Sequence, residues 1–465
     1  MAMSVIVLLA DGVRTDTLTD AIASGSLPAL ASLKRDGGMH EVTSAFPSVT
    51  GPAYAPFLMG RFPGSIGLPG LRWFDRARTT CSFPDYTRSY VGYQMGAIDR
   101  DLDPMASTIF ELVPDSIGAL SVITRGLPRR RQMAPLTRYA FRAVRTHFRG
   151  DVAGWLDVDR IVSEKVIARV RQQPTPFAFA AFTGVDKVSH ASGHESDRVL
   201  EALRIVDRTV AQLRALPNTS ETRIWVTSDH GHSRVKRHED LARVIAAHGF
   251  RVIAHPWVYR LGADAAVMVS GNAMAHVYVD LARRERPFLS GMSERGRELA
   301  EHLLQRDSVD VLLIPKDANA CAVWSRTRGR SLVVRCGDRF SYITSDGDVF
   351  GIGRELHDVD AADAHAATIG TDYPDSVVQV ARLAGAARAG DIILSASRDW
   401  DFRARYEPIP HVSSHGALHR DHMLVPLLLD RPPSRTPRRT ADVMPSALAA
   451  LGHPIPSGLD GESFF

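Results

Sequence analysis

The chain has 465 residues, of which 45% are hydrophobic and 23% are charged, with a formal net charge of +4 and a pI near 9.0. These proportions are typical of a soluble globular protein with a large core, and they exclude a disordered or collagen-like chain. The basic residues are mostly arginines, several of which cluster between residues 125 and 150. A solvated face is the favoured interpretation of this cluster, and an anionic partner or membrane is the alternative. No aromatic-interleaved motif accompanies it, so we expect no nucleic-acid partner beyond nucleotides.

Short apolar runs predict the buried strands of a mostly parallel sheet. They are Val5–Ala10, Phe177–Phe182, Ile224–Thr227 and Met423–Leu429. Between the second and third runs, apolar residues recur at three- and four-residue steps over Ser196–Leu216, which predicts a helix that ends before Pro217. Strand, helix, strand is the order of a βαβ unit, so we expect one α/β catalytic domain over residues 1–465.

Two stretches depart from this order. Residues 75–150 are rich in arginine and aromatic residues with weak periodicity, and we interpret them as a cap or lid insertion. Residues 262–355 alternate apolar and polar side chains as strands do, and Asp346-Gly347 predicts a hairpin turn among them. We therefore expect residues 262–355 to form an inserted β-rich subdomain.

Candidate metal ligands follow the predicted strands, where ligands collect in open α/β sheets. Asp11 comes directly after the first strand, although a turn or capping role would explain this residue by itself at least as well. Asp229 and His230 follow the third strand as adjacent oxygen and nitrogen donors, which favours metal ligation.

Two further groups of donors lie elsewhere in the chain. Asp186 and His190 follow the second strand and stand four residues apart, so they can face one ion from one helical turn. His415 precedes the last strand within a histidine-rich stretch, and the glycine after it makes it the favoured ligand there. His411 in the same stretch is left without an assigned role.

Thr50 is the candidate nucleophile. It stands where a helix should begin, with Pro52 near the first turn, and free N–H groups at such a point favour an anion. A metal ion beside its hydroxyl would lower the pKa further. An ordinary capping threonine is the alternative, and Ser48 is the competing hydroxyl.

The complete set indicates a centre with two metal ions. Six ligands and one hydroxyl suit two borderline divalent ions, zinc in the first place and manganese as the alternative. Two ions held about 4 Å apart can clamp the attacking and leaving oxygens of an in-line displacement.

The order of these residues resembles the alkaline phosphatase superfamily, and within it the type I phosphodiesterase and nucleotide pyrophosphatase branch. The segment FPSVTGPAYAPFLMG around Thr50 is similar to the nucleophile helix of that branch. The C-terminal ADVMPSALAALGHPIPSGLDGESF looks like the closing helix and turn of the superfamily. The resemblance implies a three-layer αβα core with a mostly parallel sheet. It also implies that one ion is held by Asp11, Thr50, Asp229 and His230, and the other by Asp186, His190 and His415.

The resemblance further implies that Thr50 attacks phosphorus and carries a covalent phosphoryl intermediate. Tyr54, Arg14 and Trp73 are the candidates for binding a small phosphorylated substrate. Ala53, three residues after Thr50, offers no side-chain donor to a phosphoryl oxygen. The substrate is therefore less determined than the chemistry.

We expect a hydrolase of phosphate diesters or pyrophosphates. A phosphomonoesterase of a small metabolite, or a phosphonate ester hydrolase, is the alternative, because one metal core can serve all of these reactions. A catalytically silent binding protein of the same fold would have lost a ligand or the nucleophile, and this chain retains every one.

The cysteines and the N-terminal residues bear on where in the cell the protein is expected. The three cysteines, Cys81, Cys321 and Cys336, are scattered without a CxxC pair, so they predict neither a disulfide framework nor a thiolate metal site. The N-terminal apolar run lacks a basic flank and a cleavage site, and no segment is long enough to span a membrane. We expect a cytoplasmic protein, and the sequence leaves its oligomeric state open.

Overall fold

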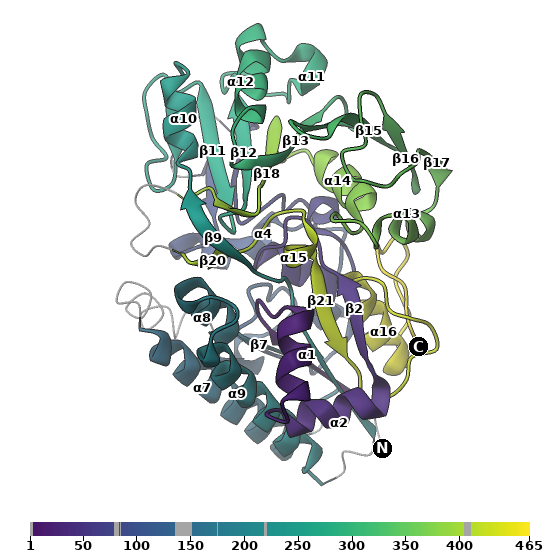
Figure 1. Ribbon diagram of the computed structural model, residues 1–465. Coiled ribbons are helices and arrows are strands. Elements are labelled where there is room, and N and C mark those ends of the chain that lie inside the picture. The colour runs from purple at the N-terminus through teal and green to yellow at the C-terminus, as the bar shows by residue number, and fades with distance from the viewer. Residues whose placement is uncertain are drawn as a thin grey trace.

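The computed structural model describes residues 3–78, 83, 85–134, 151–173, 175–217, 221–403 and 411–465. Two large sheets, one of seven strands and one of nine, form the frame of this part of the chain. In Figure 1 the seven-stranded sheet lies in the lower half and the nine-stranded sheet in the upper half. No helix in these ranges combines the length and the apolar character needed to cross a membrane.

The central sheet has the strand order β2-β21-β8-β1-β7-β5-β6. Its pairs are parallel except at β21, which runs against both of its neighbours. This confirms the mostly parallel sheet, and its inner strands are apolar throughout because helices cover them on both sides. The strands are β1 (Ser4–Ala10), β2 (Met39–Thr43), β5 (Ile117–Ala119), β6 (Gln132–Ala134), β7 (Phe177–Phe182), β8 (Thr222–Thr227) and β21 (Leu424–Leu428).

Helices cover both faces of this sheet, which gives the expected three-layer αβα core (Figure 1). One group of helices packs together beside β1, β7 and β21: α1 (Thr15–Ala23), α2 (Pro28–Gly37), α7 (Val152–Gln172), α8 (Gly184–Ser192) and α9 (Asp197–Arg214). A second group comprises α3 (Ala55–Met59), α5 (Ile109–Leu112) and α16 (Val443–Ala450). Helix α9 buries its apolar residues at the predicted three- and four-residue steps and ends before Pro217.

The second sheet has the order β10-β11-β12-β18-β13-β14-β15-β16-β17 and is antiparallel except between its first two strands. Its strands are β10 (Val252–Ala254), β11 (Ala265–Ser270), β12 (Met274–Val279), β13 (Val309–Pro315), β14 (Ala320–Ser325), β15 (Gly329–Cys336), β16 (Arg339–Thr344), β17 (Leu356–Val359) and β18 (Ile392–Ala396). The helices that accompany it are α10 (Leu241–Ala247), α11 (Phe288–Gly291), α12 (Glu294–Leu304), α13 (Ala361–Thr368) and α14 (Ser376–Ala384).

The β-rich part is therefore present, but it is longer than the predicted residues 262–355. Strand β18 returns to the middle of the sheet after two helices, and its fully buried run does not alternate. The hairpin turn is also displaced: β15 and β16 are joined at Gly337-Asp338, whereas Asp346-Gly347 follows β16. Gly337 has φ +63°, the left-handed conformation that such a tight turn favours.

The lid predicted for residues 75–150 is only partly separate from the core. Strands β5 and β6 lie within this stretch and extend the central sheet. Both strands are short and do not alternate apolar and polar residues, so the sequence does not predict them. The remaining described part includes β4 (Thr87–Ser89), which pairs with β3 (Arg72–Phe74). Residues 135–150 of the predicted lid lie outside the described residues.

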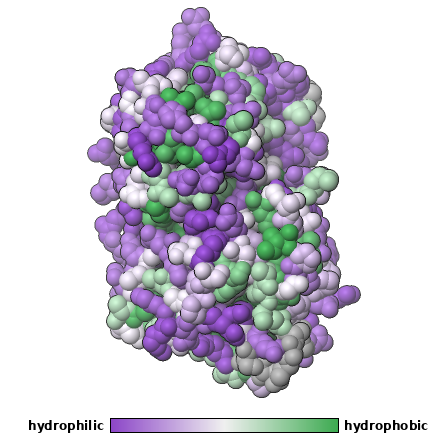
Figure 2. Space-filling model, turned by 90° about the vertical axis from the view of Figure 1, so that its right-hand side faces the viewer, coloured by the Kyte–Doolittle hydropathy of each residue, from purple (hydrophilic) through white to green (hydrophobic). Residues whose placement is uncertain are grey.

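The surface is mostly polar on the face that Figure 2 shows, which is the right-hand side of Figure 1. Apolar residues appear there in separate groups among hydrophilic ones. A small three-stranded sheet, formed by β9 (Ser233–His238), β19 (Asp399–Asp401) and β20 (Ser413–Ser414), links the segment after β8 to the C-terminal histidine-rich stretch.

Candidate metal centre

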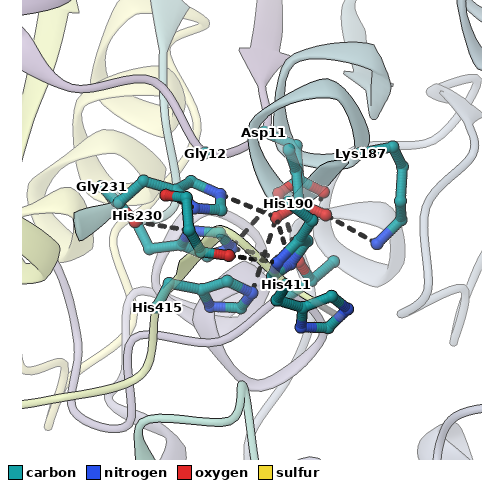
Figure 3. Close-up of polar contacts among 12 residues, drawn as sticks. Asp11, Gly12, Lys187, His190, His230, Gly231, His411 and His415 are labelled. Atoms are coloured by element: carbon teal, nitrogen blue, oxygen red, sulfur yellow. Dashed lines mark hydrogen bonds and ion pairs between the residues drawn. The ribbon is translucent and has the colours of Figure 1, made fainter. Parts of the chain in front are cut away.

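Three aspartates from neighbouring strands meet at one edge of the central sheet. Asp11 ends β1, Asp229 follows β8, and Asp186 lies on α8 just after β7. Because these three strands are parallel and adjacent, their carboxyl ends coincide. All three carboxylates are at most 1% exposed. Figure 3 shows the side chains of His190, His230 and His415 pointing toward one another.

The first group of donors consists of Asp11, Asp229 and His230, whose ligand atoms lie within 4.8 Å of one another. The Nε2 atom of His230 is 3.3 Å from Asp11 Oδ1 and 3.5 Å from Asp229 Oδ2. Thr50 faces the same group: its Oγ1 is 3.1 and 3.3 Å from the two Asp11 oxygens and 3.2 Å from His230 Nε2. The predicted nucleophile and this predicted ligand group are therefore side by side.

Thr50 does not cap the helix that follows. A short 3-10 turn (Pro52–Tyr54) precedes α3, and the residue before that turn is Gly51, with φ +98°. The threonine hydroxyl is thus directed at Asp11 and not at the helix N–H groups. The competing hydroxyl of Ser48 is buried and donates to the Ala417 carbonyl at 3.1 Å.

The second group surrounds Asp186. Its Oδ1 lies 3.2 Å from His190 Nε2, 3.5 Å from His415 Nε2 and 3.0 Å from His232 Nε2. His232 is not among the ligands predicted from the sequence. Its position two residues after His230 is the sequence feature that could have indicated it. The other oxygen of Asp186 accepts from Lys187 Nζ at 2.6 Å.

Hydrogen bonds at the far side of each ring show that these histidines fit a metal. The Nδ1 atom of His190 lies 2.8 Å from the Ser413 carbonyl, that of His415 lies 2.9 Å from the Ser48 carbonyl, and that of His230 lies 3.1 Å from the Gly231 carbonyl. A carbonyl only accepts, so each Nδ1 carries a hydrogen and each Nε2 is the ring atom that faces a carboxylate. Either a proton on Nε2 or a metal ion must lie between Nε2 and the carboxylate, and in a metal site the Nε2 lone pair would bind the ion.

The electrostatics of the pocket call for positive charge. Burial and the charge of Asp11 raise the pKa of Asp229 well above its usual value, and Asp229 Oδ2 has no hydrogen-bond partner among the described residues. Burial would lower the pKa of His230, but the carboxylates of Asp229 and Asp11 outweigh it and raise this pKa to about 9. Burial also opposes ionisation of Asp186, yet the charges of Lys187 and His190 hold its pKa well below the usual range. Divalent ions would satisfy these buried carboxylates.

The predicted substrate-binding residues are placed differently. Tyr54 is fully buried, and its hydroxyl lies 3.4 Å from Asp11 Oδ2, where it supports that carboxylate. The guanidinium of Arg14 bonds to Asp16 and donates to the His232 carbonyl at 2.7 Å.

Trp73 contradicts its predicted role, because it is 0% exposed. Its indole N–H donates to the Tyr90 hydroxyl at 3.1 Å, and the guanidinium of Arg388 lies over its ring at 4.7 Å. Trp73 therefore belongs to the core. Ala53 is also buried.

Two further histidines of the C-terminal stretch, His411 and His422, lie next to the centre. The ring of His411 lies against that of His190, with centroids 4.2 Å apart, and its Nδ1 is 2.8 Å from Asn272 Nδ2. His422 is buried behind the ligands, with Nε2 2.8 Å from the Ser233 hydroxyl. These contacts give His422 a supporting role.

Comparisons with known proteins show structures of a similar fold. The chain resembles the structure of phosphonoacetate hydrolase from Sinorhizobium meliloti 1021, with a TM-score of 0.60 and 16% identity over 97% of this chain and 96% of that one. It also resembles human ectonucleotide pyrophosphatase/phosphodiesterase 5, with a TM-score of 0.58 and 15% identity over 99% and 97% of the two chains. The murine form of that protein, in an inactive threonine-to-alanine variant with AMP, gives a TM-score of 0.56 at 14% identity over 98% and 96%.

At these identities the likeness establishes the fold, and no curated protein matches the sequence. The family model for type I phosphodiesterase / nucleotide pyrophosphatase matches residues 5–418, which contain every ligand of both groups. The chain therefore belongs to the type I phosphodiesterase / nucleotide pyrophosphatase family.

Proposed function

We propose that this phosphoric ester hydrolase cleaves phosphate diesters, with Thr50 as the nucleophile and a divalent ion at each of the two donor groups. The observation that carries the proposal is the position of Thr50 Oγ1, within 3.3 Å of both Asp11 oxygens and of His230 Nε2. A hydroxyl placed among metal donors is an activated nucleophile.

The bound ions would lower the pKa of the Thr50 hydroxyl and neutralise charge on the phosphoryl oxygens. Thr50 Oγ1 forms the new bond to phosphorus while the bond to the leaving oxygen breaks. Its hydroxyl hydrogen is directed at the Asp11 carboxylate, which offers it an acceptor. Tyr54 contacts the same carboxylate from behind and keeps it in place. Water then releases the phosphoryl group from Thr50 and completes the hydrolysis.

The choice of a diester rests on the wall beside the nucleophile. A Cβ built on Gly51 would lie 3.7 Å from Leu71 Cδ1, 3.9 Å from Ile98 Cδ1 and 3.9 Å from Val122 Cγ2. Three separate segments thus bring apolar side chains together next to Thr50. An apolar wall suits the organic substituent of a diester better than the second negative charge of a monoester.

A phosphomonoesterase is the second candidate, because Lys187 places a cation at the centre. Its ammonium is bound to Asp186 Oδ2, and its side chain is 33% exposed. An ammonium at this point would favour a dianionic phosphoryl group. The likeness to phosphonoacetate hydrolase adds phosphonates to the substrates worth testing.

The decisive variant is Thr50→Ala, with Ser48→Ala as its matched control. We expect Thr50→Ala to lower turnover by at least about 10³-fold while metal content stays the same, because only the attacking oxygen is lost. Ser48→Ala should retain most turnover, since its hydroxyl serves only the Ala417 carbonyl. Turnover and bound metal are measured on the same preparations. An active Thr50→Ala, or an inactive Ser48→Ala, would remove the assignment.

The same preparations decide the substrate class. Hydrolysis of a nitrophenyl phosphate monoester, a bis-nitrophenyl diester and a nitrophenyl phenylphosphonate should rank the diester first. The Lys187→Met variant should lose monoester hydrolysis more than diester hydrolysis. If the wild-type protein hydrolyses the monoester fastest, the phosphomonoesterase replaces the phosphodiesterase as the supported function.

A further inference from the structure

We infer that His232 is a direct ligand of the ion at Asp186, so that this ion is held by Asp186, His190, His232 and His415. The resemblance to known families gave that ion only three protein ligands. His232 is 0% exposed, and its Nε2 is the closest of the three imidazole nitrogens to Asp186 Oδ1, at 3.0 Å. The inference rests on the proposed metal centre, and its test does not depend on turnover.

The hydrogen bonding of His232 repeats that of the other ligands. Its Nδ1 lies 3.1 Å from the Ser413 hydroxyl, which itself donates to the Ser233 carbonyl at 2.9 Å. A hydroxyl has a single hydrogen, so a Ser413 hydroxyl that donates to the Ser233 carbonyl accepts from Nδ1. In that tautomer the neutral His232 ring turns a bare Nε2 toward the carboxylate of Asp186, 3.0 Å away. A cation between the two atoms removes this conflict.

The ligand atoms of Asp186, His190 and His232 all lie within 4.8 Å of one another, and His415 approaches the same Asp186 oxygen. With bonds of about 2.0–2.1 Å, the ligand atoms of a tetrahedral zinc site lie about 3.4 Å apart and its imidazole centroids about 5 Å apart. The three imidazole nitrogens lie 3.0, 3.2 and 3.5 Å from Asp186 Oδ1. The centroids of the rings of His190, His232 and His415 are separated by 4.9, 5.1 and 5.2 Å.

The ligand atoms of His230, Asp186 and His415 also lie within 4.8 Å of one another, but His230 and His415 cannot both bind one tetrahedral ion. The ring of His230 stacks on that of His415, with centroids 3.6 Å apart and planes 6° apart, which is too close for two ligands at adjacent vertices. Its centroid lies 5.6 Å from that of His232. His230 therefore belongs with Asp11 and Asp229 at the other ion.

The chain makes room for His232 at one glycine. A Cβ on Gly12 would lie 2.9 Å from both Cδ2 and Nε2 of His232, closer than such atoms approach. Gly12 has φ +80° and directly follows the ligand Asp11. The absence of a side chain at this position lets the His232 ring reach Asp186.

The two ions then differ in character. Three imidazoles and one carboxylate would saturate a tetrahedral ion at Asp186 and favour zinc or cobalt. The other position offers two carboxylates, one imidazole and the Thr50 hydroxyl, so the exchangeable position lies beside the nucleophile. Oxygen-rich donors of this kind also accept manganese.

The test replaces His232 by cysteine and loads the metal-depleted full-length protein with Co²⁺. A thiolate that binds cobalt directly produces a sulfur-to-cobalt charge-transfer band in the near ultraviolet, and a residue behind the ligands does not. We expect this band in His232→Cys and its absence in wild type. We also expect His232→Ala to weaken one of the two cobalt sites by more than the about 10–100-fold typical of losing a group behind a ligand.

His411→Gln is the matched control, because His411 lies against His190 but its Nδ1 contacts Asn272. Its cobalt stoichiometry and spectrum should equal those of wild type. Two bound ions in His232→Cys without the band would overturn the inference and leave the proposed function intact. A wild type that binds no divalent ion would instead remove the metal centre itself. If neither variant folds, the intensity of the wild-type cobalt d–d bands decides, since a six-coordinate spectrum at both sites contradicts a tetrahedral ion.

Discussion

At the scale of single residues, the metal centre depends on close contacts between side chains that lie far apart in the sequence. Asp11 and Thr50 each had a plausible capping explanation in the sequence, and only their mutual contact at 3.1 Å distinguishes them from ordinary turn residues. His232 was not singled out, because sequence spacing does not say which way a ring turns after a strand. Its ring is directed by the Ser413 hydroxyl, which lies 181 positions away.

Gly12 provides a test at this scale. Gly12→Ala places a side chain in the left-handed region and against His232, so we expect the free energy of unfolding to fall by about 1–3 kcal/mol. The substitution should also lower the affinity for the ion at Asp186, because the His232 ring must move. Gly25→Ala is the control, with φ +75° and nothing within 4 Å of its Cβ. Denaturant unfolding and metal titration separate the effects; equal metal affinity in both variants would contradict this role of Gly12.

At the scale of elements, helix α8 positions two of the ligands. Its start is held by Asp159 of α7, whose oxygens each accept a backbone N–H at 2.9 Å, from Thr183 and Gly184. Gly184 is required there, since a Cβ would lie 2.4 Å from Asp159 Oδ2. The sequence predicted the strand before α8 and its ligand spacing, but not the distant carboxylate that fixes its first turn.

The titration of Asp159 makes the free energy of unfolding depend on pH. Burial raises its pKa to about 8, against an ordinary value of 3.8. Between these values the folded state holds a proton that the unfolded state has lost, so this contribution to stability is present at low pH and disappears as pH rises to about 8. The slope approaches about 1.4 kcal/mol per pH unit.

We expect Asp159→Asn to flatten the pH dependence of unfolding between pH 5 and 8. The measurement is denaturant unfolding of metal-depleted wild type and variant across that range, so that metal binding does not contribute. Parallel stability curves for the two proteins would show that Asp159 does not titrate in this window.

At the scale of the whole molecule, the two large sheets meet at the metal centre. The turn between β11 and β12 pairs with the ligand segment: His415 N–H donates to the Gly271 carbonyl at 3.3 Å, and Ala273 N–H donates to the His415 carbonyl at 3.0 Å. The β-rich part is thus a support for one ligand as well as an insertion. The alternation of apolar and polar residues predicts that the β-rich part exists. It does not predict the full extent of this part, because β18 joins the sheet only after two intervening helices in the sequence.

The central sheet was more predictable for a physical reason. Strands buried on both faces are apolar throughout, so they stand out in the sequence, and the donors at their ends follow from parallel packing. Short strands such as β5 and β6 carry no such pattern, so the sequence alone predicts a lid where the structure has part of the central sheet.

The central claim is that Thr50 carries the phosphoryl group during turnover. The most direct measurement is acid quenching of the metal-loaded enzyme during hydrolysis of the bis-nitrophenyl diester, followed by mass spectrometry of the peptide that contains Thr50. We predict a nitrophenyl-phosphoryl adduct on Thr50, absent from unreacted enzyme and from Thr50→Ala. An unmodified Thr50 during steady turnover, or an adduct on another residue, would contradict the account.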